Sequence, residues 1–267
     1  MSKRLAAIAD MLSPGGIVAD VGCDHGFLDL YLVQTGKMDG AIAMDVRKGP
    51  LAAATEHVRQ AGLSDRIETR LSDGLEAFTA GEAKSLVCAG MGGPLMQRIL
   101  TAYPEKTESF EEFLLQPQSE LREFRVFLRE NGYKLIEERI VFEDGKYYFP
   151  MKARLAKGQS EAEEECRELY DRYGELLIRR KDPILFQYLK EQERILGTIL
   201  EQLRASGEAE DKASEGAELE KPDGAEGKAG PEKLDGTEEG AAFNRRMRLR
   251  EVEMEWEMLQ RTMSLMK

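Results

Sequence analysis

The sequence contains few of the residues that build metal centres and disulfide frameworks. Its 267 residues include three cysteines, Cys23, Cys88 and Cys166, and two histidines, His25 and His57. The cysteines form no CxxC pair and their number is odd, which argues against a zinc knuckle and against a disulfide framework. We therefore expect a protein that binds no metal.

Long apolar runs are also missing. No stretch approaches the roughly 20 consecutive apolar residues of a membrane-spanning helix. The N-terminal segment MSKRLAAIADML carries basic side chains but lacks the longer apolar core and the cleavage site of a secretory signal. We expect a cytoplasmic protein with no membrane partner.

The chain lacks an excess of positive charge. Its net charge of −12 argues at first sight against a nucleic-acid partner. Residues 205–242, however, hold twelve acidic and four basic side chains, a net of −8, which leaves −4 for the remainder. This segment has only Leu219 and Leu234 as large apolar residues, so it buries too little surface to offset its ordering entropy. We expect a disordered acidic loop over 205–242.

The first part of the chain alternates strand-like and helix-like patterns. Short apolar runs predict strands over Ile17–Val21, Ala41–Met44, Ile67–Leu71, Ser85–Ala89 and Phe113–Leu115. Helical windows such as Leu51–Ala61 and Glu120–Asn131 lie between them. This alternation predicts a mostly parallel, Rossmann-like α/β sheet with helices on both faces. Two strand-like runs around Glu143-Asp144-Gly145-Lys146 predict an antiparallel hairpin at its end.

The second part of the chain has a heptad pattern. Large apolar residues recur at alternating spacings of three and four, with Gln192 in one slot: Leu185, Leu189, Leu196, Ile199 and Leu203, then Leu249, Val252, Trp256, Leu259, Met263 and Met266. The pattern predicts two helices that pair as an antiparallel, coiled-coil-like hairpin; ordinary core helices are the alternative. We expect an α/β domain over residues 1–157 and a helical domain over 158–267, interrupted by the acidic loop.

A glycine-rich loop follows the first predicted strand. It reads Asp20-Val21-Gly22-Cys23-Asp24-His25-Gly26 and precedes a helical window at Phe27–Gln34. Glycines allow a tight turn and close approach of the backbone to a ligand. The loop departs from the dinucleotide pattern GxGxxG, and a pyrophosphate would gain nothing from its two aspartates. The ammonium and sulfonium groups of S-adenosylmethionine favour nearby carboxylates. The loop therefore favours S-adenosylmethionine over a nicotinamide cofactor, and a dehydrogenase remains the alternative.

Aspartates end the next two predicted strands. Asp45 ends the second strand, about twenty residues after the loop, where a carboxylate accepts hydrogen bonds from ribose hydroxyls. Its alternative role is that of a helix N-cap. Ser72-Asp73-Gly74 ends the third strand, where the aspartate can accept from the amine of an adenine; the alternative is an ordinary Asp-Gly turn.

Glycines and an amide follow the fourth and fifth predicted strands. The fourth ends in Ala89-Gly90-Met91-Gly92-Gly93, whose exposed backbone offers a flat surface to a target base; a flexible turn is the alternative. Gln116 ends the fifth strand, and its amide could bond a base. His25 is either a general base or a structural histidine that holds the glycine loop, and we favour the second.

Several of these motifs together resemble one family. They are Ser2-Lys3-Arg4-Leu5, Ala19–His25, Ser72-Asp73-Gly74-Leu75-Glu76, Ala89–Gly93, Leu115-Gln116-Pro117 and Glu143-Asp144-Gly145-Lys146-Tyr147-Tyr148. Over residues 1–155 the sequence resembles the bacterial tRNA (adenine(22)-N1)-methyltransferases. The resemblance implies a class I methyltransferase domain followed by a coiled-coil-like domain, with S-adenosylmethionine as cofactor and the D-arm region of tRNA as partner. We expect a monomer or a weak dimer.

The resemblance also implies roles for single residues. The catalytic residues would be Asp24, Gly90, Met91 and Gly92. The cofactor would be held by Arg4, Asp20, Gly22, Cys23, Asp24, His25, Gly26, Asp45, Val46, Ser72, Asp73, Gly74, Ala89, Gly90, Met91, Gly92 and Gln116. A methyltransferase of a small molecule or protein, or a non-catalytic scaffold that binds S-adenosylmethionine, remains an alternative.

Basic runs could dock the RNA. They are Lys3-Arg4, Arg179-Arg180-Lys181, and Arg245, Arg246, Arg248 and Arg250. Positive potential is what binding of a phosphate backbone requires. Each run could equally be a solvated helix face.

Overall fold

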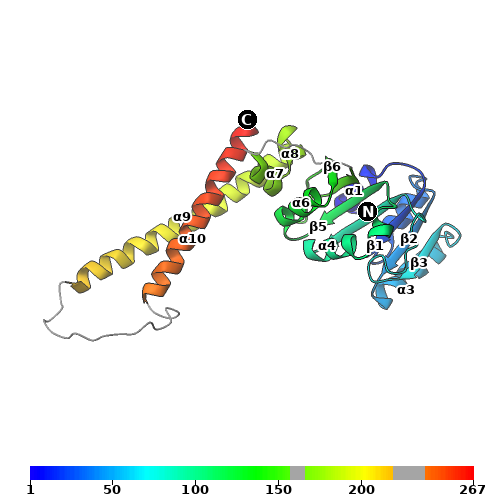
Figure 1. Ribbon diagram of the computed structural model, residues 1–267, viewed down its shortest axis with the longest axis horizontal. Coiled ribbons are helices and arrows are strands. Elements are labelled where there is room, and N and C mark those ends of the chain that lie inside the picture. Colours follow the sequence, from blue (N-terminus) through cyan, green and yellow to red (C-terminus); the bar gives the residue numbers. More distant parts are fainter. Residues whose placement is uncertain (157–165, 219–237) are drawn as a thin grey trace. The chain divides into compact units, whose positions relative to one another are not determined.

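The computed structural model describes residues 1–156, 166–218 and 238–267 (Figure 1). The chain divides into two compact units, Met1–Leu185 and Phe186–Lys267. The domain boundary that the sequence predicts, after residue 157, falls where the described residues stop, so it stays a prediction.

The first unit is built on a seven-stranded sheet. Its strands are β1 (Ile17–Val21), β2 (Gly40–Asp45), β3 (Ile67–Leu71), β4 (Ser85–Met91), β5 (Glu112–Pro117), β6 (Tyr133–Glu138) and β9 (Met151–Leu155). They follow the order β3-β2-β1-β4-β5-β9-β6, and all are parallel except β9, which runs antiparallel to both of its neighbours. The predicted Rossmann-like sheet is confirmed.

Helices cover both faces of this sheet. They are α1 (Lys3–Met11), α2 (Phe27–Gln34), α3 (Lys48–Gln60), α4 (Gly93–Ala102), α5 (Pro104–Thr107) and α6 (Leu121–Glu130). Successive residues of a strand point to opposite faces. Accordingly, Leu114 of β5 joins the apolar cluster under α1, α2 and α3, which includes Ile8 and Leu32. Its neighbour Phe113 instead meets Phe110 and Tyr133 edge to face.

The central strands are mostly apolar because both of their faces are covered. All six residues of β2 and all six of β5 are buried. A parallel sheet with helices on both sides favours such unbroken apolar runs. The edge strand β3 is covered less completely, and its burial varies along its length. This difference in burial explains why continuous apolar runs in the sequence predict the central strands.

A short hairpin stands apart from the main sheet. Strands β7 (Val141–Glu143) and β8 (Lys146–Tyr148) pair only with each other among the described strands. Asp144 and Gly145 both have positive φ, 49° and 75°, as a two-residue hairpin turn requires. The predicted hairpin is therefore present at the predicted turn. The antiparallel strand that completes the main sheet is β9.

A buried polar network ties the sheet to the end of α1. Glu112 accepts hydrogen bonds from the Ser13 amide (2.9 Å), the Ser13 hydroxyl (2.6 Å) and the Ser85 hydroxyl (2.8 Å). Lys152 lies 2.8 Å from the same carboxylate and donates to the carbonyl of Met11. Burial alone would raise the pKa of Glu112, but these hydrogen bonds lower it. The carboxylate therefore stays charged inside the core.

The helices that follow the sheet are α7 (Arg167–Tyr173), α8 (Glu175–Arg179), α9 (Pro183–Glu218) and α10 (Glu238–Leu265). In the second unit α9 and α10 run antiparallel. Glu193 accepts from Gln260 at 2.7 Å, and Arg204 pairs with Glu253 at 3.0 Å. The side chains of Leu189, Leu196, Val252, Leu259, Met263 and Met266 from the predicted heptad stripe are buried.

The prediction of a disordered loop over 205–242 is wrong at both ends of that segment, because the two helices extend into it. Helix α9 continues to Glu218 and α10 begins at Glu238, and residues 219–237 lie outside the described ones. Glutamate, alanine and lysine are good helix formers, so the chain extends each helix even where it has no apolar face to bury. Among the described residues, none of the helices has both the length and the apolar character of a membrane span.

Candidate active site

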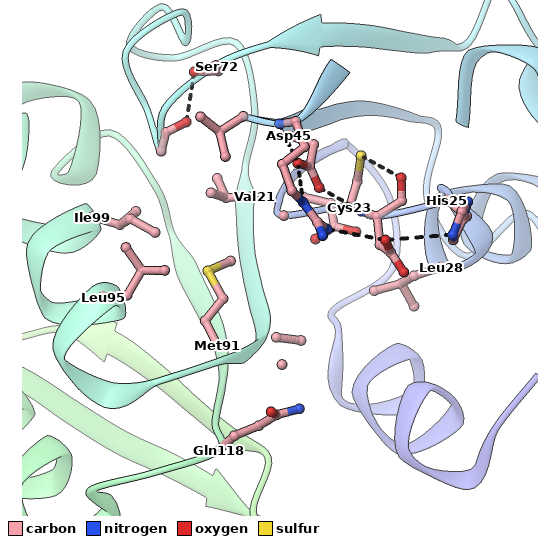
Figure 2. Close-up of a pocket in the computed structure, with 18 of the residues that line it drawn as sticks. Val21, Cys23, His25, Leu28, Asp45, Ser72, Met91, Leu95, Ile99 and Gln118 are labelled. Atoms are coloured by element: carbon pink, nitrogen blue, oxygen red, sulfur yellow. Dashed lines mark hydrogen bonds and ion pairs between the residues drawn. The ribbon is translucent and has the colours of Figure 1, made fainter. Parts of the chain in front are cut away.

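A cavity of about 650 Å³ lies at the carboxyl ends of β1–β4 (Figure 2). The strand order reverses between β1 and β4, which is where open α/β sheets bind their ligands. The predicted site residues that line the cavity are Arg4, Asp20, Gly22, Cys23, Asp24, His25, Asp45, Val46, Ser72, Asp73, Gly74, Ala89, Gly90 and Met91. Gly26, Gly92 and Gln116 were also predicted but do not line it.

The loop from β1 to α2 folds tightly. Gly22, Asp24 and Gly26 all have positive φ, at 79°, 53° and 71°. The amides of Gly22 and Cys23 both donate to the carbonyl of Met44, at 2.8 and 3.0 Å. A Cβ atom at Gly22 would lie 2.6 Å from Cε of Met91. Glycine at this position therefore keeps the backbone open between the first and fourth strands.

Asp45 is held rigidly at the end of β2. Its side chain is buried; Oδ2 accepts from the Asp24 amide (3.2 Å) and Oδ1 from the Arg47 amide (2.8 Å). The N-cap of α3 is Arg47, so the alternative N-cap role of Asp45 is not seen. Oδ1 also accepts from Nε of Arg47 at 3.4 Å, so Oδ2 keeps a further lone pair for a ligand hydroxyl. Arg47 also lies 3.3 Å from the Asp24 carboxylate and links the two acids.

The buried Asp20 has an unusual charge environment. Burial raises its pKa to about 7, the charge of Asp45 adds to this effect, and the Arg4 guanidinium opposes it. Burial also raises the pKa of the Cys23 and Cys88 thiols. Both cysteines therefore pack as neutral groups and are poor nucleophiles.

The third strand ends in a hydrogen-bonded turn. The Ser72 hydroxyl donates to the carbonyl of Gly74 at 2.8 Å and accepts from the Ala77 amide at 3.0 Å. The Asp73 carboxylate is bound by both terminal nitrogens of Arg98, at 3.1 and 2.9 Å, which lowers the pKa of Asp73. A bond from Asp73 to an adenine amine would compete with this pair, and that role stays a prediction.

The fourth and fifth strand ends interlock. The backbone amide of Gln118 donates to the carbonyl of Met91 at 2.8 Å. A Cβ at Gly90 would meet only the tips of Gln118 and Arg4, beyond 3.4 Å, whereas one at Gly93 would lie 2.9 Å from the carbonyl of Ser119. Gly90 therefore borders open space in the cavity, and Gly93 is needed for packing. Figure 2 shows Gln118 at the foot of the cavity, below Met91.

Arg4 reaches the cavity through contacts far apart in sequence. Its Nη1 donates to Oε1 of Gln116 at 3.1 Å, and its guanidinium carbon lies 5.6 Å from the ring centroid of Tyr148. Glu143 accepts from the amides of Lys3 and Arg4 at the start of α1. Gln116 is fully buried, so it orients Arg4 while the cavity wall is formed by Gln118.

His25 lies at the outer edge of the glycine loop. Its carbonyl is bonded to Nδ1 of His57 at 3.0 Å, and its ring is 5.9 Å from that of Phe27. Its Nε2 lies 3.8 Å from the Asp24 carboxylate, and nearly half of the side chain is exposed. These contacts suit a residue that fixes the loop, and the structural role stays the favoured prediction.

Sequence reasoning missed several cavity residues. Arg47, Arg98 and Gln118 line it, as do the apolar side chains of Leu95 and Ile99 on α4. Figure 2 shows these two and Met91 on the side of the cavity opposite His25. The available signal was the amphipathic character of the helix that follows the glycine-rich strand end. Among the described residues, no three His, Cys, Asp or Glu side chains are placed to hold a metal ion.

Fold and cavity together define a Rossmann-like enzyme domain whose ligand site is glycine-lined and acidic. Residues 1–151 match the family described as "Methyltransferase domain". Because these residues make up more than half of the chain, the protein belongs to this family.

Particular relatives are more specific. The tRNA (adenine(22)-N(1))-methyltransferase of Bacillus subtilis is 40% identical over 148 residues, which span 55% of this chain and 62% of that enzyme, less than two thirds of its length. The crystal structure of the B. subtilis M1A22 tRNA methyltransferase TrmK matches over 98% of both chains, with a TM-score of 0.73 and 28% identity. Another similar structure is that of a Streptococcus pneumoniae protein, described as a candidate tRNA (m1A22) methyltransferase in complex with S-adenosyl-L-methionine. It is 33% identical to this chain and has a TM-score of 0.69, and the match covers 76% of this chain and 92% of that chain.

Proposed function

We propose that this protein transfers a methyl group from S-adenosylmethionine to N1 of adenine 22 in tRNA. The observation that carries the proposal is the cavity at the β1–β4 switch point, which joins the acidic glycine loop, Asp45 and the open strand end at Gly90. The relatives with the same named activity support the choice of substrate.

The cavity residues fit the cationic methyl donor. The cavity has a volume of about 650 Å³, which is within the usual range for a nucleoside-sized ligand. The loop from Asp20 to Gly26 holds the methionine part beside carboxylates, and Asp45 accepts from the ribose hydroxyls. The turn at Ser72–Gly74 and the apolar side chain of Ile99 flank the adenine. When bound, S-adenosylmethionine supplies an electrophilic methyl group.

The chain's own task in the reaction is alignment. N1 of adenine is already nucleophilic, so no strong base is needed, and the base must leave its stack to enter the cavity. The exposed backbone at Gly90 and the amide of Gln118 border the space beside Met91 where the base would lie. Methylation places positive charge on the ring, which the Asp24 carboxylate and nearby backbone carbonyls stabilise.

Docking of the D-arm region needs positive charge. Arg4 lines the cavity. Arg179 and Arg180 are paired with acidic neighbours at 2.8 and 2.7 Å. On α10, Arg246 and Arg248 are exposed, with Arg248 3.0 Å from Glu251, and they offer a second surface for phosphates. A protein with this proposed activity would meet its tRNA substrate in the cytoplasm.

One experiment tests this function against its rivals. The purified protein is incubated with radiolabelled S-adenosylmethionine and a tRNA transcript that carries adenine at position 22, and the labelled nucleoside is mapped. A transcript with guanine at position 22 is the matched control. We expect 1-methyladenosine at position 22 and no label in the control. Label at another nucleoside, or binding of the donor without transfer to tRNA, would refute the proposal.

A further inference from the structure

One glutamine side chain in the cavity is left free by the fold. Gln118 directly follows β5, and its backbone amide is fixed by the carbonyl of Met91 at 2.8 Å. Its side chain is exposed, lines the cavity and forms no hydrogen bond within the described part of the chain. Figure 2 shows it at the foot of the cavity, below Met91. A fixed backbone and a free side-chain amide suit a residue that contacts a ligand.

The neighbouring glutamine, in contrast, is used by the fold itself. Oε1 of Gln116 accepts from Arg4 at 3.1 Å, and Nε2 of Gln116 donates to the carbonyl of Pro117 at 3.0 Å. Gln116 is fully buried, so the protein satisfies both ends of its amide. Among the described residues that line the cavity, Gln118 is therefore the one with a carboxamide side chain.

The amide of Gln118 borders open space at the end of β4. A Cβ atom at Gly90 would lie 3.5 Å from Nε2 of Gln118 and 3.6 Å from Nη1 of Arg4. Glycine at this position thus leaves room for a flat ligand beside both groups. The methyl donor is assigned to the ends of β1, β2 and β3, and β4 and β5 lie on the other side of β1 in the sheet. The end of the cavity at β4 and β5 is what remains for the target base.

The reaction restricts the edge of adenine that a side chain can contact. N1 must face the methyl group, so it cannot pair with the protein at the same time. The N6 amine donates and N7 accepts, and a glutamine amide pairs with both through its oxygen and its nitrogen. Guanine presents two acceptors, O6 and N7, so the glutamine oxygen would face O6 with no proton between them. A glutamine amide at this place therefore favours adenine over guanine.

The charged, hydroxyl and imidazole side chains described in the cavity do not supply both functions at this end. Arginine side chains only donate, and ionised aspartates only accept. The Ser72 hydroxyl is used within its own turn, where it donates to the Gly74 carbonyl and accepts from the Ala77 amide. His25 lies on the side of the cavity opposite Met91 (Figure 2). Gln118 is left as the group that matches adenine.

We propose that Gln118 determines the specificity for adenine: its side-chain amide pairs with N6 and N7 of the target base while N1 faces the methyl group. The inference rests on the proposed function for the identity of the substrate. Gln118 makes and breaks no covalent bond; it contacts the base and orients it. The amide is solvated before the base enters, so its bond to N7 contributes about 2- to 10-fold to kcat/KM. The whole pair contributes about 5- to 150-fold.

Replacing one atom of the RNA tests the pair. With saturating donor, kcat/KM is measured for tRNA transcripts that carry adenine or 7-deazaadenine at position 22; the analogue keeps N1 and the amine but has C–H in place of N7. Gln118→Ala should lose about 5- to 150-fold on the adenine transcript. The preference for adenine over the analogue should be about 2- to 10-fold greater for wild-type protein than for Gln118→Ala. Comparing the two proteins cancels the reactivity of the analogue itself.

Two further variants sharpen the comparison. Gln118→Glu keeps the acceptor for the amine but turns a second oxygen toward N7, so its preference for adenine should be lower than that of Gln118→Ala. The control is Gln34→Ala, which removes an exposed glutamine at the end of α2 that does not line the cavity. It should match wild-type protein on both transcripts within about twofold. Calorimetry should find the donor affinity of Gln118→Ala within about twofold of wild type.

The outcomes separate the two proposals. No methylation of adenine 22 by folded wild-type protein would overturn the proposed function. Methylation there with the same preference in wild-type protein and Gln118→Ala would overturn this inference alone. So would a loss of turnover in Gln118→Ala that a matching loss of donor affinity explains. If thermal denaturation shows that Gln118→Ala is unfolded, the same comparison is made with Gln118→Leu, which keeps the bulk of the side chain.

Discussion

Replacing Asp45 with asparagine should weaken binding of S-adenosylmethionine by roughly 10- to 150-fold. Each carboxylate oxygen of Asp45 already accepts one backbone amide, from Asp24 at 3.2 Å and from Arg47 at 2.8 Å. An asparagine turns one of these oxygens into a donor, which faces an N–H and cannot accept from the ribose. The loss of one charge-assisted hydrogen bond to the ligand costs about 1.5–3 kcal/mol.

The matched control lies at the other end of the same strand. Asp39 directly precedes β2 and accepts the amide of Gly16 at 2.6 Å, but it does not line the cavity. Asp39→Asn should therefore keep the affinity within about twofold of wild type. Both variants are compared by calorimetry at pH 7.5 after their folding is checked by thermal denaturation. If folded Asp45→Asn bound as tightly as Asp39→Asn, the ribose contact assigned to Asp45 would be wrong.

Three further predictions concern stability, turnover and tRNA. Glu112→Ala leaves the buried Lys152 without its counter-ion and should lower the free energy of unfolding by about 3–5 kcal/mol in urea denaturation; a loss below about 1 kcal/mol would contradict the network. Asp24→Ala should reduce kcat about tenfold or more when the donor is saturating, and unchanged turnover with normal donor binding would remove Asp24 from the mechanism. Reversing Arg246 and Arg248 to glutamate should weaken tRNA binding in a filter assay and reduce its salt dependence by about two phosphate contacts. Equal binding by this double variant would exclude that surface.

Local patterns predicted the elements that bring the site together. The helix at Phe27–Gln34 and the strand at Ile67–Leu71 have the bounds expected from their apolar periodicity. Asp45 ends its strand as expected. Parallel strands carry their carboxyl ends to one edge of the sheet, so motifs that follow strands meet there whatever their separation in sequence. This rule made most of the cavity wall predictable.

Pairing across the fold was not predictable in the same way. Gln116 was expected to face a ligand, yet it is buried in β5 and Gln118 lines the cavity. Which side chain faces the cavity depends on the irregular register between β4 and β5 at Ala89 and Met91, and no local pattern reveals it. The Arg98 partner of Asp73 is likewise 25 residues away in sequence.

One signal was present in the sequence but was not used. Asp29 interrupts an otherwise apolar helical window, and an acid on the core side of such a helix must find a cation, a donor or a proton. The structure buries Asp29, and neither of its carboxylate oxygens has a hydrogen-bond partner among the described residues.

The motifs at the two ends of the domain form one structural unit around Arg4. Glu143 in the hairpin turn region caps the start of α1, Tyr148 packs on the guanidinium, and Gln116 accepts its hydrogen bond. Some 140 residues separate Arg4 from the hairpin, so no local signal links them. Their shared effect is to fix one cation at the cavity edge, where it opposes the burial that raises the pKa of Asp20. The hairpin therefore contributes to the electrostatics of a ligand site that it does not itself line.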